Sequence, residues 1–286
     1  KYHARDIGRF RAAKCGALML LASATPSLDS YTHALKGDYQ LLELKNRINL
    51  SFPKIEFIDL NEQLKHRQSY IVSKPLVKEI QDCLNHHKQA IILLNRRGYS
   101  PIIKCCECSS VLMCSDCDTP LNYHKDENLL KCHQCGRTYK VLRTCPNCGK
   151  QSLLYYGFGT KKVEEELSKL FPEASIDRMD RDAVYRKGAH EAILKKFEAH
   201  ESDLLIGTQM IAKGLDYPDV TLVGILNADA GLMHQDYNSA KMTFDLLMQA
   251  SGRSGRANHE GKVLIQAFNP EHYVLKAVIS QDYRAE

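Results

Sequence analysis

The chain has 286 residues, which is long enough for one large domain or two ordinary ones. Its 44% hydrophobic and 26% charged content is typical of a soluble globular protein, and a formal net charge of +5 permits a nucleic-acid partner without establishing one. The longest apolar run, residues 15–24, is too short to cross a bilayer, and no signal peptide is visible. We therefore expect no membrane partner. Because the first residue is Lys1, we also expect a fragment of a longer protein.

The first fifty residues predict two helices and two strands. Residues 1–14 are basic and predict a solvated helix, and the apolar run 15–22 predicts a buried strand. A second helix is expected to open near Ser27, and residues 40–44 predict another short strand. Residues 46–53 have little pattern and are the candidate linker. None of this indicates a function by itself.

From residue 55 onward, strands and helices alternate. The predicted strands are residues 55–60, 90–94, 174–179, 203–206, 220–226 and 262–268. One predicted helix starts at Ser73 and another ends at Phe171. Two more cover residues 188–199 and 239–250. This alternation predicts an α/β fold with a parallel sheet covered on both faces. A cysteine-rich block interrupts it after the second strand, at the edge where α/β folds place functional loops.

Nine of the eleven cysteines lie between residues 105 and 148. Eight of them form four C-x-x-C pairs: Cys105 and Cys108, Cys114 and Cys117, Cys132 and Cys135, Cys145 and Cys148. Two thiolates at this spacing reach one metal from a tight turn, and two such turns complete a tetrahedron around zinc. The sequence therefore predicts two zinc sites of four cysteines each. The alternatives are disulfides or scattered redox cysteines, but the spacing and the lack of secretory features favour metal-bound thiols in a reducing cytoplasm.

The linkers indicate which pairs share a metal. Residues 118–131 are long enough for a hairpin that folds the two inner pairs onto one zinc, whereas residues 109–113 leave little slack to join the first two pairs. We expect a nested arrangement, with a cross-brace as the alternative. Zinc 1 would be held by Cys105, Cys108, Cys145 and Cys148, and zinc 2 by Cys114, Cys117, Cys132 and Cys135. Cys106, His124 and His133 are left as structural or surface residues.

Two loops carry residues suited to phosphate chemistry. In the first, Thr208, Lys213 and Asp216 follow a strand, although such a loop is about as often structural. In the second, Arg253 and Arg256 each follow a glycine, and their guanidinium groups can each donate paired hydrogen bonds to phosphate oxygens, as an arginine finger does. The alternative for this second loop is two surface arginines on a glycine-rich turn. The glycines favour the functional interpretation, because they destabilise a helix end unless their conformation is needed.

These motifs resemble a known family. The triplet 23–25 (SAT), the loop 208–216 and residues 249–256 (QASGRSGR) resemble motifs III, V and VI of superfamily 2 helicases. More specifically, the chain resembles the primosomal replication-restart DNA helicases over nearly its whole length. That likeness is carried by the four C-x-x-C pairs together with residues 2–6 (YHARD), 23–30 (SATPSLDS), 95–99 (NRRGY), 206–216 (IGTQMIAKGLD), 227–229 (NAD) and 268–272 (FNPEH).

The resemblance implies a RecA-like lobe of an ATP-dependent 3′→5′ helicase that recognises stalled or abandoned forks and promotes replication restart by primosome assembly. Implied cofactors are two Zn²⁺, with ATP and Mg²⁺ in the full-length protein. Implied partners are forked DNA, single-stranded DNA, primosome proteins and single-strand-binding protein, in the cytoplasm. The implied site residues are Gln249, Arg253 and Arg256 for catalysis; Ser23, Ala24, Thr25, Thr208, Lys213, Gly214 and Asp216 for coupling nucleotide to DNA; and Arg96, Arg97 and Thr160 for DNA binding.

The chain also departs from the family pattern. It contains no G-x-x-x-x-G-K-[ST] phosphate loop and no D-E-x-H before Ser23. We therefore expect it to be unable to hydrolyse ATP by itself. The expected parts are the end of a first lobe (1–50), the first part of a second lobe (51–104), the zinc insertion (105–148) and the rest of the second lobe (149–286). The alternative functions are a zinc-ribbon DNA-binding module without catalysis and another zinc-bearing superfamily 2 translocase.

Overall fold

The computed structural model describes residues 3–23, 25–44, 53–66, 69–95, 102–124, 127–180, 188–208, 211, 217–233, 238–252 and 261–280. It divides into two compact units, residues 1–48 and residues 49–286. Among the described residues, no helix is both long enough and apolar enough to span a bilayer.

The first unit contains two helices, α1 (Ala4–Cys15) and α2 (Leu28–Leu35). Helix α2 begins as expected, because the side chain of Ser27 accepts a hydrogen bond from the backbone N–H of Ser30. The guanidinium of Arg5 joins the two helices: it donates to the hydroxyls of Ser27 and Ser30 and lies 3.6 Å from the carboxylate of Asp29.

Both strands predicted in this unit are wrong. Cys15 is the last residue of α1, and residues 17–23 and 40–44 belong to no helix or sheet. Leu18 and Leu44 are 96% and 98% exposed. A strand needs a neighbour for its backbone hydrogen bonds, and the described part of this unit supplies none. The predicted linker, residues 46–53, lies outside the described residues except for its last position.

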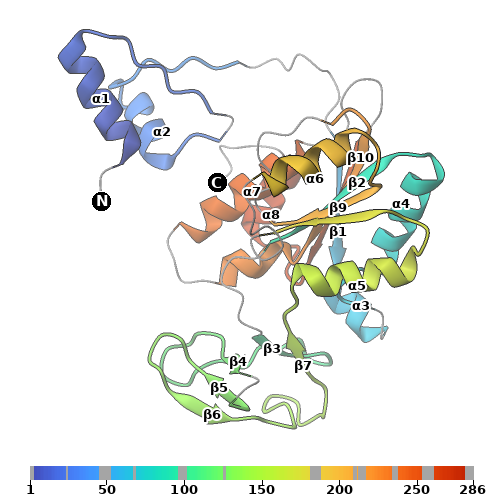
Figure 1. Ribbon diagram of the computed structural model, residues 1–286. Helices are drawn as coiled ribbons and strands as arrows, with labels where there is room; N and C mark the ends of the chain where they lie inside the picture. Colours follow the sequence, from blue (N-terminus) through green and yellow to red (C-terminus); the bar gives the residue numbers. More distant parts are fainter. Residues whose placement is uncertain are drawn as a thin grey trace. The chain divides into compact units, whose positions relative to one another are not determined.

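The second unit is built on a six-stranded parallel sheet in the order β1-β11-β10-β2-β9-β8 (Figure 1). The strands are β1 (Lys54–Asp59), β2 (Gln89–Leu94), β8 (Ile176–Met179), β9 (Leu204–Gly207), β10 (Val220–Leu226) and β11 (Lys262–Ala267). All pair in parallel. The predicted α/β fold with a parallel sheet is confirmed.

Helices cover both faces of this sheet. One hydrophobic cluster joins Ile91 and Leu93 of β2 to α6 (Ala189–Glu198), α7 (Ser239–Ser251) and α8 (Tyr273–Ser280). A second cluster joins the alternate residues of β2 to α3 (Leu60–Lys65), α4 (Lys74–Asn85) and α5 (Thr160–Leu170). All six residues of β2 are buried, as expected for an inner strand of a sheet covered on two sides.

The cysteine block forms a second sheet, antiparallel and five-stranded, in the order β6-β5-β4-β3-β7. Its strands are β3 (Ile102–Cys105), β4 (Asn122–His124), β5 (Leu129–Lys131), β6 (Thr138–Lys140) and β7 (Leu153–Tyr156). Strands β3 and β7 enter and leave the block side by side, with Ile102 opposite Tyr156 and Cys105 opposite Leu153. A short 3₁₀ helix, η1 (Ala228–Met233), follows β10 in the parallel part.

Candidate metal centres and the loops of the parallel sheet

The four C-x-x-C pairs adopt the same backbone turn. In each, the N–H of the first cysteine donates to the carbonyl five residues later, at 2.7 to 2.9 Å, and its carbonyl accepts from the N–H four residues later, at 2.8 to 3.0 Å. The residue that donates this second bond has a positive φ in all four turns. These residues are Ser109 (φ 58°), Asp118 (52°), Gly136 (76°) and Gly149 (71°). Each turn aims both of its thiols to one side.

The eight thiols gather into two sets of four. Cys105, Cys108, Cys145 and Cys148 form the outer set, and Cys114, Cys117, Cys132 and Cys135 form the inner set. Within each set all sulfurs lie within 4.8 Å of one another. The structure thus brings together the nested sets expected from the linkers and not the cross-braced ones.

The sulfur spacing fits zinc. The distance from Cys105 Sγ to Cys148 Sγ is 3.6 Å, as is that from Cys108 Sγ to Cys145 Sγ, and Cys114 Sγ lies 3.8 Å from Cys135 Sγ. Ligands about 2.3 Å from a tetrahedral zinc are separated by about 3.8 Å, so little movement is needed to close either site. Both the outer and the inner set could therefore hold a metal ion.

Hydroxyl groups surround the thiols. Ser110 Oγ lies 3.0 Å from Cys108 Sγ and 3.4 Å from Cys145 Sγ in the outer set. In the inner set, Tyr139 Oη lies 3.1 Å from Cys114 Sγ and Thr119 Oγ1 lies 3.3 Å from Cys132 Sγ. Such donors stabilise thiolates and orient them toward a metal.

These contacts divide the thiols by acidity. The hydrogen bond from Ser110 lowers the pKa of Cys108 to about 5, and that from Thr119 lowers the pKa of Cys132 to about 6. The pKa of Cys117 is raised to about 12, first by its hydrogen bond with Cys135 and then by burial. Because thiolates held this close repel each other, four of them require a bound cation.

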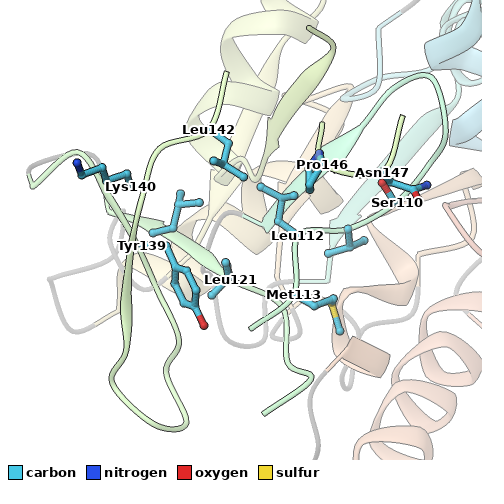
Figure 2. Close-up of a pocket in the computed structure, with 11 residues that line it drawn as sticks. Ser110, Leu112, Met113, Leu121, Tyr139, Lys140, Leu142, Pro146 and Asn147 are labelled. Atoms are coloured by element: carbon cyan, nitrogen blue, oxygen red, sulfur yellow. The ribbon is translucent and has the colours of Figure 1, made fainter. Parts of the chain in front are cut away.

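An apolar groove of about 320 Å³ lies in the same block (Figure 2). Its lining includes Met113, which directly precedes Cys114, and Pro146, which follows Cys145, so it adjoins both cysteine sets. Met113 and Leu142 are 42% and 41% exposed. The full lining is Ser110, Val111, Leu112, Met113, Leu121, Leu130, Tyr139, Lys140, Leu142, Pro146 and Asn147.

Three of the segments that carry the motifs named above begin at the carboxyl edge of the parallel sheet. Asn95 follows β2, Thr208 follows β9 and Asn227 follows β10, and parallel strands bring these ends to one edge. Gln249 lies in the last turns of α7. The glycine that opens the Thr208 loop has a packing role: a Cβ on Gly207 would lie 2.6 Å from the carbonyl oxygen of Met179.

The structure describes only some of the other predicted site residues. Thr160 is buried at the start of α5, where its hydroxyl donates to the carboxylate of Asp180, a residue that also pairs with Arg178 at 2.8 Å. In the first unit, the backbone N–H of Thr25 donates to Ser23 Oγ at 3.1 Å. The remaining residues lie outside the described part of the chain: Ala24, Arg96, Arg97, Lys213, Gly214, Asp216, Arg253 and Arg256.

The sequence assigned no role to two buried charged residues near this edge. Asp229, in η1, is 3% exposed, and one carboxylate oxygen accepts from the N–H groups of Phe268 (2.8 Å) and Asn269 (2.9 Å). Lys104, in β3, is 5% exposed, with its Nζ 3.8 Å from the centroid of the Phe268 ring. Burial raises the pKa of Asp229 and lowers that of Lys104. Asp229 thus holds the backbone of Phe268, and Lys104 contacts its ring. The sequence signal that could have pointed to Asp229 is a charged residue shortly after an apolar strand.

Comparison with known proteins places these features in a family. The family described as Helicase conserved C-terminal domain matches residues 127–258, and the family of Trm112p-like proteins matches residues 109–141. The structure of Saccharomyces cerevisiae Dbp5 bound to RNA and ADP BeF3 is 14% identical over 99% of this chain and 54% of that one, with a TM-score of 0.46.

Relatives in sequence are much closer. The replication restart protein PriA of Bacillus subtilis is 43% identical over 284 residues, which are 99% of this chain and 35% of that protein. The PriA proteins of Chlamydia pneumoniae and Haemophilus influenzae are 42% and 39% identical, over 99% and 100% of this chain and 38% and 39% of theirs. The chain spans somewhat more than a third of the length of the relatives it matches. With its parallel sheet, its match to the helicase conserved C-terminal domain and its two sets of four cysteines, the chain belongs to the family of the replication restart protein PriA.

Proposed function

We propose that the chain is part of an ATP-dependent 3′→5′ DNA helicase that acts at stalled or abandoned replication forks and promotes restart by primosome assembly. The observation that carries the proposal is the identity of about 40% with replication restart proteins PriA along essentially the whole chain. A match of this length takes in both the parallel sheet and the cysteine block.

In this proposal the carboxyl edge of the parallel sheet faces nucleotide and DNA. Arg253 and Arg256 neutralise charge on the ATP phosphates, as arginine fingers do, and Gln249 orients the reacting groups. Ser23, Ala24 and Thr25 connect nucleotide state to lobe movement. Thr208, Lys213, Gly214 and Asp216 contact nucleotide and DNA, and Arg96, Arg97 and Thr160 contact DNA. For Thr160 this requires that its hydroxyl exchange Asp180 for a phosphate, or that its backbone N–H makes the contact.

The outer and inner cysteine sets would hold two structural Zn²⁺ ions, whose binding supplies folding energy to a block with only a small apolar core of its own. Forked and single-stranded DNA, primosome proteins and single-strand-binding protein are the proposed partners, and the apolar groove beside the cysteines supports docking of a protein. Thiol metal sites suit a reducing compartment, so we place the protein in the cytoplasm.

Catalysis would require residues that this chain lacks. Neither a phosphate-loop lysine nor an acidic Mg²⁺ ligand of the D-E-x-H type occurs in its 286 residues, so ATP and Mg²⁺ would be bound productively only in the full-length protein.

The test is ATP hydrolysis by the full-length protein, with and without forked DNA, beside the 286-residue chain. We expect DNA-stimulated turnover in the former and none in the latter. In the full-length protein, Arg253→Ala should abolish turnover and leave DNA affinity nearly unchanged, and a proportional loss of affinity would refute the finger role. If a folded, zinc-loaded full-length protein hydrolysed no ATP, a DNA-binding zinc module without catalysis would instead be favoured.

A further inference from the structure

Two histidines of the cysteine block face each other outside both cysteine sets. The Nε2 atoms of His124 and His133 are 2.9 Å apart, and the ring centroids are separated by 5.2 Å with the ring planes at 54°. His133 is exposed and His124 is half-buried. Neither residue has a place in the helicase chemistry or in the cysteine sets, so this pair needs a separate explanation.

The backbone holds both rings in position. His124 is the last residue of β4 and lies opposite Leu129 of β5. His133 directly follows Cys132, whose N–H and carbonyl are fixed by hydrogen bonds to Arg137 and Gly136, each 2.9 Å long. The two imidazoles therefore extend from elements that the hairpin and the inner cysteine turn already order. Because the two side chains are already held close together, little of their conformational entropy would be lost when a ligand binds both.

The spacing matches that of two nitrogen ligands on one metal ion. Imidazole nitrogens bind zinc at about 2.0–2.1 Å, so two of them are about 2.9 Å apart at a right angle and about 3.3 Å apart at the tetrahedral angle. The observed 2.9 Å lies at the lower end of this range. We propose that His124 and His133 form a third metal site, which binds a divalent transition ion such as Zn²⁺ through both Nε2 atoms.

This third site differs from the cysteine sites in strength and openness. Two neutral imidazoles leave the remaining coordination positions to water, so the ion should exchange readily, whereas four thiolates enclose theirs. Imidazole ligands select ions such as Zn²⁺, Ni²⁺ and Cu²⁺ over Mg²⁺ and Ca²⁺, which prefer oxygen. A direct N–H···N hydrogen bond between the rings also gives a separation of about 2.9 Å, and the ion would replace the proton of that bond.

The experiment measures zinc bound to the zinc-loaded 286-residue chain by equilibrium dialysis at increasing free Zn²⁺. We expect three ions per chain at saturation and two after passage over a mild chelating resin. His124→Ala and His133→Gln should each hold two ions at every free zinc concentration. Glutamine keeps a hydrogen-bonding side chain but is a poor zinc ligand, so this variant separates ligation from a purely structural pairing.

His86→Ala is the matched control, because His86 is an exposed histidine at the end of α4 and should leave the third ion in place. Added Zn²⁺ should also shift the Nε2 resonances of both His124 and His133 in nitrogen-detected NMR spectra. Saturation at two ions in the unsubstituted chain, equal zinc binding by the chain and His133→Gln, or Nε2 resonances that do not respond to zinc would each overturn the proposal.

Discussion

At the scale of single residues, Cys106 is a control for the proposed metal sites, because it lies in the cysteine block but outside both cysteine sets. It lies between Cys105 and Cys108 in the sequence but belongs to neither set, and its N–H donates to the carbonyl of Ser152 at 2.9 Å. Cys145, in contrast, is 1% exposed and belongs to the outer set. The two residues therefore form a matched pair for substitution by serine.

We expect Cys145→Ser to reduce the tightly bound zinc from two ions per chain to about one, because three thiolates no longer close a tetrahedron. Cys106→Ser should retain both ions. Metal content by atomic absorption, after removal of loosely bound ions, gives the number. Two tightly bound ions in Cys145→Ser, or one in Cys106→Ser, would contradict the assignment of the outer set.

Asp229 offers a test of buried charge. One of its carboxylate oxygens accepts two backbone N–H groups, whereas the other, Oδ1, is buried without a hydrogen bond among the described residues. Burial raises the pKa of this carboxyl in the folded state. The folded protein therefore holds the proton more strongly than the unfolded chain, and folding stability falls as the pH rises above the ordinary carboxyl pKa.

Asp229→Asn removes this charge and keeps an oxygen for the two N–H groups. We expect it to raise the free energy of unfolding at neutral pH by about 1–3 kcal/mol, because the variant no longer buries a negative charge, and leaving a buried polar group poorly solvated costs about that much. The gain should shrink at a mildly acidic pH where both cysteine sets stay loaded. Urea unfolding at the two pH values measures it, with the exposed Asp82→Asn as a control. A variant less stable at both values would mean that attraction to Lys104 outweighs the burial.

At the scale of elements, the four cysteine turns show which side chains their left-handed position accepts and which it does not. The position four residues after the first cysteine is left-handed in all four turns, and glycine occupies it in only two of them. Ser109 and Asp118 show that a small polar side chain is tolerated there. A β-branched side chain at this φ is a greater strain, because the second heavy atom on its Cβ adds to the crowding against the backbone.

Gly136→Val should destabilise the inner turn by about 1–2 kcal/mol, the cost of a left-handed conformation for a residue with a Cβ. Zinc transfer from the inner set to a chromophoric chelator should then be about ten-fold faster, since about 1.4 kcal/mol corresponds to a factor of ten. A Cβ at this position meets no described atom within 4 Å, so the effect would come from the backbone alone. Gln134→Ala, in the same turn, should transfer zinc at the original rate, and equal rates for the two variants would remove the strain argument.

The sequence predicted the parallel sheet well because each strand carries its own apolar run between helix caps. Ser73, for example, opens α4 as expected, and β10 (Val220–Leu226) has the predicted bounds. Some short elements were missed: α3 starts directly where β1 ends, and β3 and β6 have only four and three residues. For the candidate metal centres, residue type and spacing were enough to find both cysteine sets. They could not show the contact of Lys104 with Phe268, because these two residues are far apart in the chain.

At the scale of the whole molecule, hydrophobic burial is concentrated in one of the two units. Among the described residues, every buried hydrophobic side chain lies between Ile58 and Val278, in the three clusters of residues 49–286 or beside them. The described part of residues 1–48 contains no buried residue, although Phe10, Leu20 and Leu42 are large and apolar, with 69%, 76% and 71% of their surface exposed. The strand predictions failed in this unit because apolar runs specify a strand only when a sheet is present to receive them.

Residues 49–286 should therefore fold without residues 1–48. We expect the shortened chain to keep both tightly bound zinc ions and a free energy of unfolding within about 0.5 kcal/mol of the complete chain, the range for changes that leave a core intact. Residues 1–48 alone should show only fluctuating helix, because α1 and α2 have 12 and 8 residues and isolated helices of this length are marginal in water. Circular dichroism and urea unfolding of the two pieces provide the measurement. A shortened chain that loses zinc or unfolds at markedly lower urea would show that the parallel sheet draws stability from the first 48 residues, and the chain would then have to be treated as one cooperative unit.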